Sequence, residues 1–121
     1  MMYVLPTDDM VKEFSRDELN IMIQDTECLR NRVKETKAKG SDTTMYKKSF
    51  PGGVLNLAGA ESPRSFRAKT VRVMMFDDVD GFNVTAGSEG DPVKLGEKRS
   101  LTYSDSKSIL CSTPTLSLIH I

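Results

Sequence analysis

The chain has 121 residues, which is room for one small domain or for part of a larger one. Its 38% hydrophobic and 28% charged residues are ordinary for a soluble globular protein and argue against a disordered chain. No apolar run approaches the length that spans a bilayer, and the start lacks a basic-then-apolar signal pattern, so we expect no membrane contact and a cytoplasmic location.

The net charge is zero, but the charges are unevenly distributed. Residues 1–29 hold two basic and seven acidic residues, and residues 73–121 hold four basic and seven acidic residues. Residues 30–72 hold eleven basic and three acidic residues, a local charge of +8 that suits contact with a polyanion. A solvated face balanced by the acidic flanks explains the same pattern. Charge alone favours the solvated face, because no aromatic interleaving or folded nucleic-acid motif accompanies the lysines.

The chain opens with a predicted strand at residues 3–5, and almost no sequence precedes it. This abrupt start leads us to expect a piece of a longer protein. Thr7 or Asp8 is the predicted N-cap of the helix that follows. Ser15 and Glu18 have the spacing of a capping box, so the pattern leaves open whether one helix or two follow the strand.

The next segment predicts a hairpin. Residues 34–41 are a polar connection, and residues 44–49 and 54–57 are short strand candidates. Residues 50–53 read Phe-Pro-Gly-Gly, which is turn chemistry between antiparallel strands. Residues 62–63 read Ser-Pro, the N-cap and first position of a short predicted helix.

The second half predicts strand, helix and strand. Residues 71–76 are nearly all apolar, which is typical of a strand covered on both faces in a parallel sheet. Asp91 and Pro92 predict the start of a helix that runs through about Tyr103. Residues 108–111 form a last apolar strand. Strands that alternate with helices predict an α/β fold with a layered sheet.

Polar residues follow three predicted strands, at Pro6-Thr7, Asp77-Asp78 and Ser112-Thr113. In α/β sheets the chemistry gathers at these carboxyl ends of the strands. Mg²⁺ commonly keeps waters and uses one or two carboxylates together with substrate phosphates, and P-loop ATPases hold it with a strand-end Asp. We assign Asp77 to a metal ion and Asp78 to the attacking water. A strand that ends in a solvated acidic loop is the structural alternative.

Other chemical signatures are weak. A glycine-rich phosphate loop ending in Lys-Ser or Lys-Thr is missing from the sequence, so either the chain is no P-loop ATPase or the loop lies before Met1. His120 is the only histidine, which leaves no histidine-based metal cluster or triad. Cys28 and Cys111 lack metal or redox spacing, and we expect both to be small buried hydrophobic residues.

Five segments together resemble the large terminase subunit of the lambda-like branch of tailed phages. They are VLPTDDMVKEFSRDEL, FPGGVLNLAGAESP, VRVMMFDDVDGF, EGDPVKLGEKR and ILCSTPT, in that family's order and spacing from Tyr3 to Thr115. The resemblance implies that residues 1–115 are part of a RecA-like P-loop ATPase domain, an α/β fold with a mostly parallel central sheet flanked by helices. It places the phosphate loop upstream and a nuclease domain downstream. Residues 116–121 depart from the family, and we expect them to be a non-native tail.

The resemblance also implies roles for the strand-end residues. Asp77 and Asp78 occupy the Walker B position, where the family usually has Glu as the second acid, so Asp78 is shorter by one methylene. Ser112 and Thr113 fall on the coupling motif, which senses the γ-phosphate and links hydrolysis to DNA movement. Without the resemblance, these two residues would be a simple strand end. Three basic residues ahead of the Walker B strand are candidate contacts to phosphate or DNA: Arg64, Arg67 and Lys69.

The implied function is Mg²⁺-dependent ATP hydrolysis that packages viral double-stranded DNA into procapsids, in the cytoplasm of the infected bacterial host. ATP and Mg²⁺ are the implied cofactors. Implied partners are double-stranded DNA, the small terminase subunit, the portal of the procapsid and further copies in a homo-oligomer, and the full-length protein is expected to carry an endonuclease domain. Two alternatives stay open: a helicase-like nucleic-acid motor, and an inactive prophage remnant that retains only DNA binding.

Overall fold

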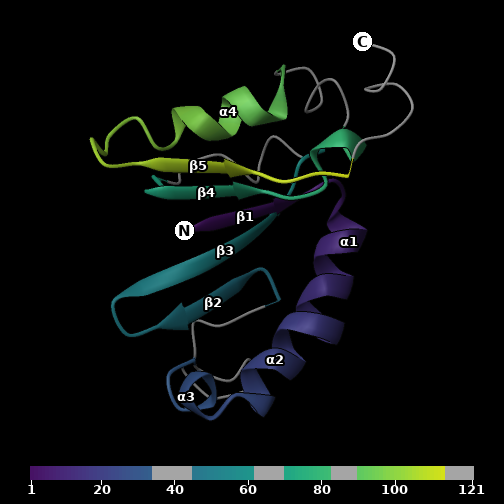
Figure 1. Cartoon of the computed structure of the whole chain (residues 1–121), viewed down its shortest axis with the longest axis vertical. Coiled ribbons are helices and arrows are strands. Elements are labelled where there is room, and N and C mark those ends of the chain that lie inside the picture. The colour runs from purple at the N-terminus through teal and green to yellow at the C-terminus, as the bar shows by residue number, and fades with distance from the viewer. Residues whose placement is uncertain (34–44, 62–69, 83–89, 114–121) are drawn as a thin grey trace.

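A computed structural model describes residues 1–33, 45–61, 70–82 and 90–113 of the chain. Its strands are β1 (Met2–Leu5), β2 (Lys47–Phe50), β3 (Gly53–Gly59), β4 (Val73–Phe76) and β5 (Lys107–Leu110) (Figure 1). Its helical elements are α1 (Asp8–Glu13), a π-helical segment (Phe14–Leu19), α2 (Asn20–Asp25), α3 (Glu27–Arg30), a 3-10 turn (Val79–Gly81) and α4 (Pro92–Lys98). The predicted α/β class is therefore confirmed.

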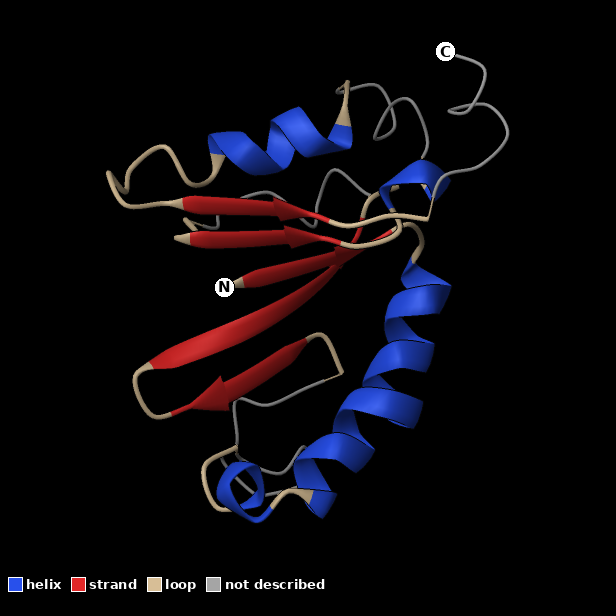
Figure 2. Cartoon of the chain, in the orientation of Figure 1, coloured by secondary structure: helices blue, strands red, loops and turns tan. Residues whose placement is uncertain are grey.

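The strands form one sheet in the order β2-β3-β1-β4-β5 (Figure 2). β1 is parallel to β3 and β4, and β4 is parallel to β5. β2 alone is antiparallel, because Gly52 with its positive φ of 90° turns the chain back between β2 and β3. The mostly parallel sheet and the hairpin are both confirmed.

Helices cover both faces of this sheet (Figure 1). On one face, Val11 and Leu19 of the first helix pack against Leu5 and Leu57 of the strands. On the other face, α4 packs against a cluster that includes the buried Met74 and Phe76 of β4. The chain moves from β1 to β3 in one direction across the sheet and from β4 to β5 in the other. Since such connections are nearly always right-handed, opposite directions place the helices on opposite faces.

The first helix is a single run. The Thr7 hydroxyl accepts from the Met10 N–H, which confirms Thr7 as the N-cap. Ser15 starts no second helix, because its carbonyl accepts from the Asn20 N–H within the π-helical segment. The helix continues into α2, so the alternative of two separate helices at this point is settled in favour of one.

Helix α4 begins as predicted, since the Asp91 carboxylate caps the Val93 N–H. It ends before the predicted Tyr103. The Arg99 carbonyl accepts from the Val71 N–H, and the Ser100 hydroxyl donates to the Glu97 carbonyl, so the last turn is closed by partners that helix periodicity does not reveal.

Strand coverage differs from the prediction for residues 71–76. Met74 and Phe76 are buried under α4, whereas Val73 and Met75 on the other face are only half-buried. Strand β5 lies at the edge of the sheet, and its Ile109 and Leu110 are 46% and 51% exposed. Within the described residues, no helix is both long and apolar enough to cross a membrane.

Lys48 of β2 is buried in an unexpected place. Its side chain is 2% exposed and lies opposite Leu55, on the face that the first helix covers. Its ammonium has no hydrogen-bond partner among the described residues, and burial lowers its pKa. We expect Lys48→Met to raise the free energy of unfolding by about 1–3 kcal/mol, because methionine fills the same space without a buried polar group. Denaturant unfolding of the chain measures this.

The lowered pKa of Lys48 makes the folding stability of the chain depend on pH. A lowered folded-state pKa means that the unfolded chain binds the proton more tightly, so stability rises with pH up to the unfolded value of 10.5. The Lys48→Met chain lacks this rise. Lys47→Met, on the neighbouring half-buried residue, is the control and keeps it. A loss of stability in Lys48→Met would show that the ammonium is well paired.

Candidate functional site

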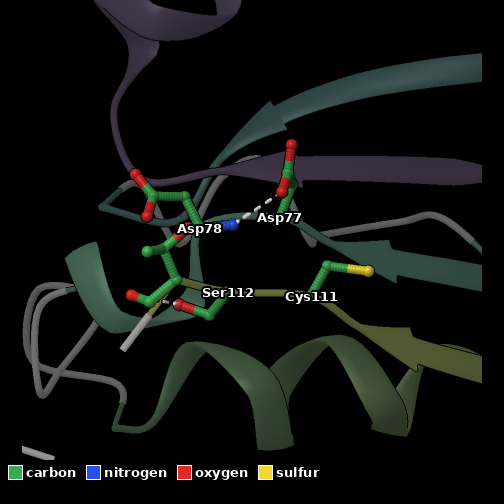
Figure 3. Close-up of a pocket in the computed structure, with 5 residues that line it drawn as sticks. Asp77, Asp78, Cys111 and Ser112 are labelled. Carbon is green, nitrogen blue, oxygen red and sulfur yellow. Dashed lines mark hydrogen bonds between the residues drawn. The ribbon is translucent and has the colours of Figure 1, made fainter. Parts of the chain in front are cut away.

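An open pocket of about 480 Å³ lies at the carboxyl ends of β4 and β5. Asp77, Asp78, Cys111, Ser112 and Thr113 line it (Figure 3). The structure thus brings together the four residues that the sequence singled out at these strand ends. The pairing of Phe76 with Leu110 explains this, since it leads both chains out of the sheet side by side.

Backbone hydrogen bonds hold the two strand ends together beyond the sheet. The Cys111 N–H donates to the Phe76 carbonyl at 2.9 Å, and the Val79 N–H donates to the Cys111 carbonyl at 3.3 Å. The Asp80 N–H donates to the Ser112 hydroxyl at 3.0 Å. Ser112 is therefore attached directly to the loop that carries the two aspartates.

The Asp77 carboxylate is held at both oxygens. Its Oδ1 accepts from the Asp78 N–H at 2.9 Å, and its Oδ2 accepts from the Tyr3 hydroxyl at 2.5 Å. Its own N–H donates to the Val4 carbonyl of β1. The Asp77 side chain is therefore fixed by one donor at each carboxylate oxygen.

Tyr3 was not among the predicted site residues. Burial, and then its hydrogen bond to Asp77, raise the pKa of Tyr3, so its hydroxyl keeps the proton that it donates. Its ring stacks on Phe14, with centroids 5.2 Å apart and planes 16° from parallel. No sequence signal reveals this role, because it follows from the parallel pairing of β1 with β4, which places Tyr3 beside Met75 and two residues short of Asp77.

Asp78 has left-handed backbone angles, with φ of 55° and ψ of 46°. Among the described residues it is the only one other than glycine with a positive φ. Aspartate tolerates this region better than most residues, and strained backbone is often found at functional sites. The turn directs the Asp78 carboxylate away from that of Asp77 (Figure 3), so the two acids are free to contact different atoms.

The pocket residues suit a metal ion that is also bound by waters and by a phosphate group. The described residues contain no group of three or more His, Cys, Asp or Glu side chains that could hold a metal by themselves. Two carboxylates and two hydroxyls fit Mg²⁺ that is shared with phosphate oxygens and waters, which is its usual coordination at phosphate-transfer sites. No Lys or Arg of the described chain lines the pocket.

Several predicted residues have other positions. Thr7, at the third polar strand end, caps α1 and does not line the pocket. The candidate phosphate or DNA contacts Arg64, Arg67 and Lys69, and His120, lie outside the described residues, as do the Ser62-Pro63 helix start and the predicted tail. Much of the basic region 30–72 is also outside them.

The expectation of two buried cysteines is wrong. Cys28 and Cys111 are both exposed. Cys111 continues β5, the edge strand of the described sheet, and lines the pocket. An apolar strand pattern does not reveal whether a strand lies at the edge of a sheet, so the exposure of Cys111 could not be predicted from it.

The comparisons with known proteins agree with the predicted family. The family model "Phage terminase large subunit gpA, ATPase domain" matches residues 1–121. The chain is 30% identical over 112 residues to the "Terminase, large subunit" of Enterobacteria phage P21, which covers 92% of this chain and 17% of that protein. It is 31% identical over 111 residues to the "Terminase, large subunit" of Escherichia phage lambda, which covers 91% of this chain and 17% of that protein.

No solved structure shows significant similarity to the chain. The chain spans about 17% of the length of the two terminase subunits that it matches. Because the family model covers the described strands, helices and pocket, the chain belongs to the family of ATPase domains of phage terminase large subunits.

Proposed function

We propose that this chain carries the metal-binding and water-activating residues of a Mg²⁺-dependent ATPase that packages viral double-stranded DNA into procapsids. One observation carries the proposal. In a chain of the terminase family, Asp77 and Asp78 share a single pocket with Ser112 and Thr113 at the carboxyl ends of parallel strands. Ligands of open α/β sheets bind at such strand ends.

The proposed fold is part of a RecA-like P-loop domain. The mostly parallel sheet with helices on both faces supports it. The described lining of the pocket is acidic and holds no cation, so we expect a phosphate loop that these 121 residues lack to bind the β- and γ-phosphates. A strand that carried this loop would fit the open edge of β5, which borders the pocket and exposes Ile109 and Leu110.

The two aspartates of the pocket have separate roles in this proposal. Asp77, with both oxygens oriented, holds Mg²⁺. When bound, Mg²⁺ neutralises phosphate charge in phosphoryl transfer. Asp78 points elsewhere and accepts a hydrogen bond from the attacking water, which it orients and deprotonates.

Ser112 and Thr113 serve as the coupling element. The Ser112 hydroxyl accepts from the Asp80 N–H and lies 3.4 Å from the Thr113 carbonyl. A shift of Ser112 on loss of the γ-phosphate would therefore pull on the loop that follows β4. This contact supports a link between hydrolysis and movement of DNA.

Family membership supports the wider assembly. The proposed partners are double-stranded DNA, a small terminase subunit, the portal of the procapsid and further copies in a homo-oligomer, acting in the infected host cell. An endonuclease domain belongs to the proposed full-length protein. Arg64, Arg67 and Lys69 are proposed to contact phosphate or DNA.

The test uses the longest protein that the source reading frame encodes. We expect it to hydrolyse ATP with Mg²⁺, to lose this activity in EDTA, and to package double-stranded DNA into purified procapsids when the small subunit is added. DNA binding without any nucleotide binding would contradict the proposal and favour the remnant.

The isolated 121-residue chain gives a separate prediction. Its rate of ATP hydrolysis should be at or near background, because the contacts to the β- and γ-phosphates are missing. A phosphate-release assay with Mg²⁺ measures this. Robust turnover that Asp77→Ala abolishes would show that the described pocket is sufficient.

A further inference from the structure

The hydroxyl of Tyr3 makes a contact that packing alone does not require. Tyr3 lies on β1 beside Met75 of β4, and its side chain follows the strand direction to reach Asp77 Oδ2. The stack on Phe14 holds the ring from the side of the first helix. The phenol is therefore fixed at its ring and aimed at one carboxylate oxygen.

Two donors from different elements thus define the orientation of Asp77. The Tyr3 hydroxyl comes from β1 and the Asp78 N–H from the loop after β4. A carboxylate oxygen has two acceptor sites, so each oxygen of Asp77 keeps one free. The side chain is held without using up its capacity to bind a cation.

We propose that Tyr3 is a positioning residue, which fixes the Asp77 carboxylate in the orientation that binds Mg²⁺. The inference rests on the proposed function, since it takes Asp77 as the metal ligand. Tyr3 does not line the pocket and acts through its hydrogen bond to Asp77. Groups that orient metal ligands in this way typically change metal affinity by about 10–100-fold when they are removed.

Two other roles for the same hydroxyl make different predictions. A purely structural hydroxyl would affect folding stability but not the metal. A hydroxyl that competes with the metal for Oδ2 would, when removed, make Mg²⁺ bind more tightly. The measured Mg²⁺ affinity separates the three.

The experiment compares Tyr3→Phe with the parent in the longest protein that the source reading frame encodes. Phenylalanine keeps the ring and its stack on Phe14 and removes only the hydroxyl. Binding of a fluorescent, non-hydrolysable ATP analogue is followed by anisotropy while Mg²⁺ is titrated. We expect the half-saturating Mg²⁺ concentration to rise about 10-fold, with no change in the affinity for the analogue in EDTA.

Four further variants complete the design. Tyr103→Phe is the matched control, because Tyr103 packs under Arg72 at the opposite end of β4, and it should leave the titration unchanged. Asp77→Ala should remove the Mg²⁺ response, and Tyr3→Phe added to it should have no further effect. If Tyr3→Phe fails to fold by circular dichroism, Tyr3→Met removes the hydroxyl in its place and should give the same shift.

The outcomes are distinguishable. If Asp77→Ala removes the Mg²⁺ response but Tyr3→Phe changes nothing, or tightens Mg²⁺ binding, the positioning role is overturned and the proposed function stands. If Asp77→Ala leaves the Mg²⁺ response intact, the metal assignment of the proposed function fails, and the role of Tyr3 fails with it.

Discussion

Asp78→Asn is expected to lower kcat for ATP hydrolysis by about 10²–10⁴-fold, the usual contribution of a positioned general base. Asparagine has nearly the same shape and tolerates the left-handed angles of this residue, so the backbone turn should persist. Asp77 should keep its hydrogen bond from the residue 78 N–H, because that bond involves the backbone. The loss should therefore be confined to kcat, with nucleotide affinity in Mg²⁺ close to that of the parent.

Steady-state kinetics and anisotropy on the longest encoded protein measure the two quantities separately. Asp105→Asn is the matched control, since Asp105 is an exposed acid in a surface pair with Arg72, and such pairs contribute little. A rise in KM at unchanged kcat would mean that Asp78 contacts the nucleotide and not the water.

Asp77→Ala should abolish the stimulation of ATP hydrolysis by millimolar Mg²⁺. In the proposed site its carboxylate is the oriented oxygen ligand of Mg²⁺, and the described residues contain no group of three or more His, Cys, Asp or Glu side chains that could hold the ion instead. We expect the half-saturating Mg²⁺ concentration to rise by more than about 100-fold, beyond the effect of losing an orienting partner alone.

The same substitution leaves the Tyr3 hydroxyl and the Asp78 N–H without their acceptor, at a cost of about 1 kcal/mol each in unfolding free energy. Asp77→Asn restores one acceptor and separates the two effects: it should recover part of the stability but none of the Mg²⁺ response. Full Mg²⁺-dependent turnover in either variant would place the metal elsewhere.

Local chemistry made much of the fold predictable. Thr7 and Asp91 predicted the starts of two helices, because their side chains cap the first free N–H groups. Phe50 to Gly53 gave the hairpin, since Gly52 adopts the positive φ that this turn needs. The end of α4 was not predictable, because it depends on a residue that is distant in sequence. The Val71 N–H donates a hydrogen bond to the Arg99 carbonyl.

Part of the candidate site could also be predicted from the sequence, and part could not. Asp77, Asp78, Ser112 and Thr113 could be grouped in advance, because the carboxyl ends of adjacent parallel strands meet at one edge. The contribution of Tyr3 required the register between β1 and β4, which a single sequence does not specify. The left-handed turn at Asp78 and the exposure of Cys111 likewise follow from tertiary placement and not from local pattern.

The proposed function requires Mg²⁺ and nucleotide to bind at the carboxyl ends of β4 and β5. Replacing Mg²⁺ with Fe²⁺ and adding ascorbate and peroxide produces radicals that cut the backbone near the metal. In the longest encoded protein with a non-hydrolysable ATP analogue, we predict cuts within residues 76–79 and 110–113 that excess Mg²⁺ suppresses. Cuts confined to other segments, or unaffected by Mg²⁺ and by Asp77→Ala, would show that the metal binds away from these strand ends.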